Sequence, residues 1–141
     1  RFSYTLHPQD KDLVFIAGGI GITPLMSMLR HMWDTQADIS VLLIWGNKSE
    51  ADIIFRQELE AMAAGENPRL QVVYLLDKPG DTWQGEKGYL SAELLRKYIK
   101  DGFAKRTYYI CGPPIMTDPA LRLLRELGVP ADKIDYEQFW L

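Results

Sequence analysis

The sequence predicts an α/β protein with a doubly wound, five-stranded parallel sheet, helices on both faces and the strand order 3-2-1-4-5. Two observations support this fold class. Short apolar runs rich in β-favouring residues alternate with segments of helical periodicity, and turns rich in glycine and proline separate them. The predicted strands contain almost only apolar residues, as strands buried on both faces of a parallel sheet should.

The first cycle shows the pattern clearly. Asp12–Ala17 is the first predicted strand, and apolar residues on one face of the segment from Leu25 to Trp33 predict an amphipathic helix. Thr23 is expected to cap this helix and Pro24 to occupy its first position. The remaining predicted strands are residues 39–45, 70–76, 107–111 and 133–136, and the remaining helices cover about 53–64, 91–99 and 114–127.

Composition excludes several classes of function. A net charge of −3 and a pI near 5.4, without a basic cluster, argue against binding to nucleic acid. No segment approaches the roughly 20 apolar residues that cross a bilayer. The single cysteine, Cys111, can form no internal disulfide, and with His7 and His31 it gives no pattern of metal ligands, so we expect no metal site.

The loop after the first strand is the first candidate binding site, with the sequence Gly18-Gly19-Ile20-Gly21-Ile22-Thr23-Pro24. Glycines allow the backbone to turn tightly and to approach a ligand closely. The N–H groups and the dipole of the following helix favour an anion, and a pyrophosphate fits such a place. The loop lacks the lysine of a P-loop, which disfavours ATP chemistry. The alternative is a tight turn that binds nothing.

The loop after the fourth predicted strand, Cys111-Gly112-Pro113-Pro114, is the second candidate. In an open doubly wound sheet, ligands bind beyond the carboxyl ends of the strands, where both loops lie. A thiol followed by glycine and two rigid prolines places a small polarizable group at that edge. The alternative is that Cys111 is only a small buried apolar residue.

Together the two loops resemble the nicotinamide-binding domain of the ferredoxin–NADP reductase superfamily. That family has a Gly-Gly-x-Gly-x-Thr-Pro loop after its first strand and a Cys-Gly-Pro loop after its fourth, and here the two stand roughly ninety residues apart. Asp52–Leu59 resembles the family's Asp-x-x-x-x-x-Glu-Leu segment, and Glu137-Gln138-Phe139 resembles its C-terminal Glu-x-aromatic. The resemblance covers about Asp12 to Leu141.

The resemblance implies an NAD(P)H-dependent flavoprotein reductase that transfers electrons, of which this chain is the NAD(P)-binding part. The pyrophosphate and its ribose would be bound by the first loop, namely Gly18, Gly19, Ile20, Gly21, Thr23 and Pro24. Cys111, Gly112 and Pro113 would lie against the nicotinamide, Glu137 would orient the site, and Phe139 or Trp140 would cover the flavin. Cys111 and Glu137 are therefore the candidate catalytic residues.

The choice between NADH and NADPH is expected to depend on Asn47 and Lys48, which follow the second predicted strand. An acidic residue there would bind the ribose diol and repel a 2′-phosphate, and none occurs before Glu50. Lys48 either meets a 2′-phosphate or is a solvated loop lysine. The sequence leaves the preference open.

The resemblance also implies a partner domain. The family's β-barrel, which binds FAD or FMN, is missing, so residues 1–10 are expected to be a connector from it and residues 11–141 the NAD(P)-binding domain. Further expected partners are a redox acceptor (an iron–sulfur protein, a haem or a membrane domain), and the expected location is the cytoplasm or the cytoplasmic face of a membrane. The alternative function is a module of the same fold that senses nucleotides or docks a partner without redox catalysis.

Overall fold

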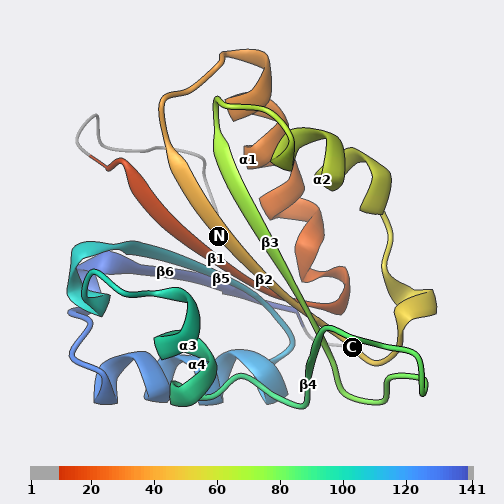
Figure 1. Cartoon of the computed structure of the whole chain (residues 1–141). Coiled ribbons are helices and arrows are strands. Elements are labelled where there is room, and N and C mark those ends of the chain that lie inside the picture. The colour runs from red at the N-terminus through yellow and green to blue at the C-terminus, as the bar shows by residue number, and fades with distance from the viewer. Residues whose placement is uncertain (1–9, 140–141) are drawn as a thin grey trace.

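The computed structural model describes residues 10–139 (Figure 1). The strands are β1 (Asp12–Gly18), β2 (Ser40–Asn47), β3 (Arg69–Leu76), β4 (Glu86–Lys87), β5 (Thr107–Gly112) and β6 (Ile134–Gln138). The helices are α1 (Ile22–Asp34), α2 (Arg56–Ala63), α3 (Ala92–Tyr98) and α4 (Pro114–Glu126). Short 3-10 turns are η1 (Gly19–Gly21), η2 (Glu50–Asp52), η3 (Phe103–Lys105) and η4 (Ala131–Lys133). The expected connector at residues 1–10 lies, except for Asp10, outside the described residues.

The sheet is parallel throughout and has the order β4-β3-β2-β1-β5-β6. The five predicted strands are β1, β2, β3, β5 and β6, and they occur in the predicted order. The prediction of only five strands was wrong, because β4 adds a sixth at the edge. Side chains outside the strand hold Glu86 there: Tyr98 donates to its carboxylate at 2.6 Å, and the Trp83 indole donates to its carbonyl at 3.0 Å.

Helices cover both faces of the sheet, as the sequence predicted. Figure 1 shows α1 and α2 on one face and α3 and α4 on the other. Alternate residues of the central strands divide between two apolar clusters: Phe15 and Leu43 pack with α1 and α2, while Ile16 and Ile44 pack with α3 and α4. This follows from the period of two along a strand, and it places the odd-numbered Cys111 on the α1 face.

Two helices begin at places that the sequence did not predict. The N-cap of α1 is Gly21, not Thr23, because η1 leads straight into the helix. Thr23 and Pro24 are therefore its second and third residues, and the expectation that Pro24 stands first was wrong. Helix α2 begins at Arg56 rather than near Ile53, since Phe55 has a left-handed conformation with φ of 58°. The Arg30 guanidinium lies 5.1 Å from the centre of the Phe55 ring and holds this residue against α1.

Candidate functional site

The two predicted loops touch each other through their backbones. Strands β1 and β5 are neighbours, and Ala17 pairs with Cys111 at their carboxyl ends. A Cβ atom added at Gly21 would lie 2.1 Å from the carbonyl oxygen of Cys111 and 2.9 Å from the Cα of Gly112. Only glycine allows so close an approach, so the two loops form one continuous backbone surface.

Gly19 is the exposed corner of the first loop. Its φ of 52° is left-handed, and a Cβ atom added there would meet nothing within 4 Å. The indole Nε1 of Trp45 donates a hydrogen bond to the Gly19 carbonyl at 3.0 Å, and Trp45 itself is fully buried. The hydrogen bond from Trp45 therefore fixes the Gly19 peptide, while the space where a side chain would begin stays open. Sequence reasoning assigned Trp45 only to a strand.

Met116 packs across the glycines that end β1 and β5. A Cβ atom added at Gly18 would lie 2.8 Å from its Cε atom, and one added at Gly112 would lie 2.5 Å from the same atom. The two glycines thus leave the room that Met116 fills. Sequence reasoning missed this residue, because an apolar residue near the start of a helix gives no signal of such a contact.

The first turn of α1 follows η1 directly, beyond the carboxyl end of β1. The N–H of Ile22 donates to the carbonyls of Gly19 and Ile20, and Pro24 has no N–H, so these two residues offer a ligand no backbone donor. Thr23 is exposed and Pro24 half-buried, so the hydroxyl of Thr23 is accessible at the positive end of the helix dipole. The local field favours an anion.

Asn47, at the carboxyl end of β2, has a buried side chain that is 9% exposed. Its Nδ2 atom has no hydrogen-bond partner among residues 10–139, which is uncommon for a buried amide. Lys48 is exposed. In the turn that follows, Ser49 and Asp52 bond each other reciprocally and form a capping box. The edge beside β1 thus carries one unused amide donor and one exposed cation.

Cys111 is fully buried on the α1 face of the sheet, and its strand pairs with β6. Burial raises the pKa of its thiol to about 12, and the negative charge of Glu137, its register partner on β6, adds to the effect. The thiol is therefore neutral across the physiological range of pH. Phe139 lies just beyond Glu137, and its N–H donates to the Gly112 carbonyl at 3.0 Å. Cys111, Gly112, Glu137 and Phe139 are thus held together.

The protonated state of Cys111 predicts slow alkylation. We expect native chain to react with iodoacetamide at pH 8 at least about a hundredfold more slowly than urea-unfolded chain, because the thiolate is the nucleophile. The rate for the native chain should rise with pH until the pKa of about 12 is reached, whereas the rate for the unfolded chain should level off near pH 9. Mass spectrometry of quenched samples gives both rates. Equal rates at pH 8 would contradict the burial of a neutral thiol.

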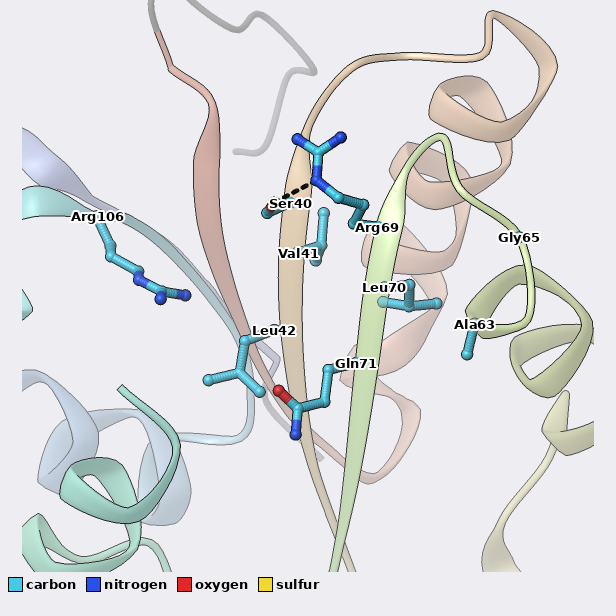
Figure 2. Close-up of a pocket in the computed structure, with 9 residues that line it drawn as sticks. All are labelled: Ser40, Val41, Leu42, Ala63, Gly65, Arg69, Leu70, Gln71 and Arg106. Carbon is cyan, nitrogen blue, oxygen red and sulfur yellow. Dashed lines mark hydrogen bonds between the residues drawn. The ribbon is translucent and has the colours of Figure 1, made fainter. Parts of the chain in front are cut away.

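A hollow of about 320 Å³ lies at the other end of the sheet (Figure 2). It is lined at the amino ends of β2 and β3, and its two arginines are already bound to carboxylates: Arg69 to Asp38 at 2.8 Å and Arg106 to Asp101 at 3.1 Å. It is therefore a poor candidate for the chemical site. Over residues 10–139 there is no group of three metal-ligating side chains and no helix long and apolar enough to cross a membrane.

A parallel α/β sheet whose glycine loops meet at its carboxyl edge defines a nucleotide-binding domain of the doubly wound class. The family model described as "Oxidoreductase NAD-binding domain" matches residues 15–121. The chain belongs to this family, the NAD-binding domains of flavin-dependent oxidoreductases.

Relatives and solved structures agree with this assignment. The chain is 33% identical to NADH-cytochrome b5 reductase 1 of Eremothecium gossypii, covering 84% of this chain and 42% of the relative. It is 35% identical to the glycine betaine monooxygenase reductase subunit of Pseudomonas aeruginosa, covering 94% and 36%. The CS-b5R domains of human Ncb5or in the NAD+ form superpose with a TM-score of 0.80 at 30% identity, covering 95% and 39%. The chain thus spans less than half the length of these proteins.

Proposed function

We propose that this chain binds NAD(P)H across the carboxyl edge of its sheet and presents the nicotinamide for hydride transfer to FAD or FMN. The contact of Gly21 with the backbone of Cys111 and Gly112 carries the proposal, because it joins the two candidate loops into one surface. The names of the reductases to which the chain is similar, and the NAD+ form of the human neighbour, support it.

The pyrophosphate end of the proposed site is the first loop. The positive end of the α1 dipole attracts phosphate oxygens, and the exposed Thr23 hydroxyl donates to one of them. Gly18, Ile20 and Pro24 complete the loop. Gly19 keeps the approach open, since no atom stands within 4 Å of where its side chain would begin.

The nicotinamide end is built from β5 and β6. NAD(P)H, when bound, supplies the hydride. The chain would supply position: Gly112 and Pro113 would contact the ring, and the neutral thiol of Cys111 would add no charge that opposes transfer. Glu137 would orient the ring, and Phe139 would cover the flavin when nicotinamide is absent. Trp140, the other candidate for this cover, lies outside the described residues.

The ribose end is assigned to the carboxyl end of β2. The unpartnered Nδ2 atom of Asn47 is a donor for a ribose hydroxyl or a phosphate oxygen. Lys48 beside it is exposed and is the candidate contact for a 2′-phosphate. If so, Lys48→Ala lowers affinity for NADPH and leaves affinity for NADH unchanged.

The remaining partners are a flavin-binding domain and a redox acceptor such as cytochrome b5, another haem protein or a ferredoxin. Ile20 and Ile115 extend the loops with apolar side chains that are 61% and 87% exposed, a surface that a flavin-binding domain would cover. We place the reaction in the cytoplasm or at the cytoplasmic face of a membrane. Subcellular fractionation, with the protein detected by an antibody, would test this location.

Titration calorimetry of the chain with NADH, NADPH and ADP-ribose tests the function. We expect saturable binding that Gly19→Glu weakens by roughly tenfold or more, equal to about 1.4 kcal/mol, because the new carboxylate repels the pyrophosphate. Thr23→Ala is expected to weaken binding by a smaller factor.

Gly128→Glu is the matched control. Gly128 also has a left-handed φ, of 89°, and open space around its missing side chain, but it follows the far end of α4. The Gly128→Glu variant adds the same charge and the same backbone strain away from the loops, so binding of the three ligands should be unchanged. Equal effects of the two variants, or no binding of any of the three ligands to the parent at millimolar concentration, would refute the proposed site.

A further inference from the structure

The side chain of Gln138 joins the last strand to helix α4. Its Nε2 atom donates to the Thr117 hydroxyl at 2.8 Å and to the Asp118 carboxylate at 2.7 Å. Both hydrogens of the amide are therefore used. Thr117 is fully buried, so one of the two bonds lies where water cannot replace it. The other is stronger than a neutral bond, because its acceptor is charged.

Gln138 stands between two residues of the proposed site. In the β5–β6 register, Glu137 pairs with Cys111 and Gln138 pairs with Gly112. The next residue, Phe139, donates its N–H to the Gly112 carbonyl and packs against the cluster on the α1 face. Successive side chains along a strand point to opposite faces. Gln138 therefore bonds α4 on one face while its neighbours face the proposed nicotinamide site.

Strand β6 has few other attachments. Within residues 10–139 it is the last strand of the sheet and pairs only with β5, and none of its side chains is fully buried. The hydrogen bonds of Gln138 thus attach the carboxyl end of β6, next to the proposed nicotinamide site, to helix α4. An edge strand held on one side alone opens easily.

We propose that Gln138 is a positioning residue for the nicotinamide end of the site: by bonding Thr117 and Asp118 it fixes segment 137–139 against Cys111 and Gly112. The proposal rests on the proposed function and deepens it. Gln138 itself touches no reacting atom. It acts through Glu137 and Phe139, so its loss affects ligands that carry a nicotinamide more than ligands that lack one.

The test uses a reversal of donor and acceptor. Gln138→Glu removes the amide hydrogens and places a second carboxylate beside that of Asp118. In the double variant Gln138→Glu/Asp118→Asn, the introduced amide donates to the introduced carboxylate, and the Thr117 hydroxyl donates to it as well. Asp118→Asn alone is the control for the loss of charge, and Gln138→Met removes both bonds without adding any charge.

Two readouts are compared on the 141-residue chain alone and on this chain together with the flavin-binding domain proposed above. Gln138→Glu and Gln138→Met are expected to weaken NADH binding about tenfold, the ratio that one hydrogen bond to a charged group supplies, and to leave ADP-ribose binding within about twofold. Amide hydrogen exchange at Phe139 should accelerate by a similar factor. The reversed pair should restore both readouts to within about threefold of the parent.

Each outcome decides the matter. NADH and ADP-ribose weakened equally, or a reversed pair that behaves like Gln138→Glu, would show that Gln138 only stabilises the fold and would overturn the proposal. Unchanged NADH binding with faster exchange at Phe139 would overturn it too, while the proposed function stands. A parent chain that binds neither NADH nor ADP-ribose in either form would reject both proposals.

Discussion

Gly21→Ala is expected to destabilise the chain by about 3 kcal/mol or more and to abolish NADH binding, which is the largest effect among the variants considered. The added Cβ would stand 2.1 Å from the carbonyl oxygen of Cys111 and 2.5 Å from the carbonyl carbon of the same residue. Both are backbone atoms of the central strand β5, so the clash can be relieved only if β5 and the α1 cap move apart. Urea denaturation followed by tryptophan fluorescence measures the loss.

Gly19→Ala is the control for Gly21→Ala. It introduces the same methyl group at a residue with φ of 52° but with nothing within 4 Å. The expected loss is about 1 kcal/mol, from backbone strain alone. If Gly21→Ala were as mild as Gly19→Ala, the two loops could not be in the backbone contact described here.

Trp45→Phe is expected to have the second largest effect, a destabilisation of about 2 to 3 kcal/mol. The indole is fully buried, and its loss leaves a cavity and removes the donor to the Gly19 carbonyl. Since that bond fixes the exposed corner of the first loop, NADH affinity should fall as well, by about tenfold. Urea denaturation and calorimetry measure the two effects.

Trp33→Phe separates the role of this bond from that of tryptophan as such. Trp33 is half-buried near the C-terminal end of α1, where it packs against Gly65. The first loop precedes the opposite end of this helix. We expect a smaller loss of stability and unchanged binding of NADH. A Trp45→Phe variant that bound NADH as tightly as Trp33→Phe would show that the Gly19 peptide keeps its orientation without the indole.

The sequence predicted the parallel sheet and its strand order because the central strands are long, buried and almost wholly apolar. It did not predict β4, because two residues in a glycine-rich loop carry no periodic signal. The bonds that Trp83 and Tyr98 make with Glu86 hold that strand, and both side chains lie outside the two residues that form it. Likewise, α2 begins only after the left-handed Phe55, and Phe55 contacts Arg30 of α1.

The candidate site divides in the same way. Glycines and Cys111 stand in loops whose composition is unusual, so sequence reasoning selected them. The residues that hold those loops, Trp45, Met116 and Gln138, stand where apolar or variable residues are ordinary, and only the folded chain shows what they touch. Their hydrogen bonds and contacts join segments far apart in sequence.

Strand β4 also has a consequence for the behaviour of the chain at high concentration. It pairs only with Leu75 and Leu76, so the outer edge of β3 from Arg69 to Tyr74 lacks a neighbouring strand among the described residues. Such an edge can accept a strand from another molecule, and polar or charged side chains oppose that. Arg69 and Gln71, both exposed, stand on this edge. Self-association at high concentration should begin at this unpaired edge of β3. Because Arg69 and Gln71 oppose it, replacing these two residues with apolar ones should promote aggregation.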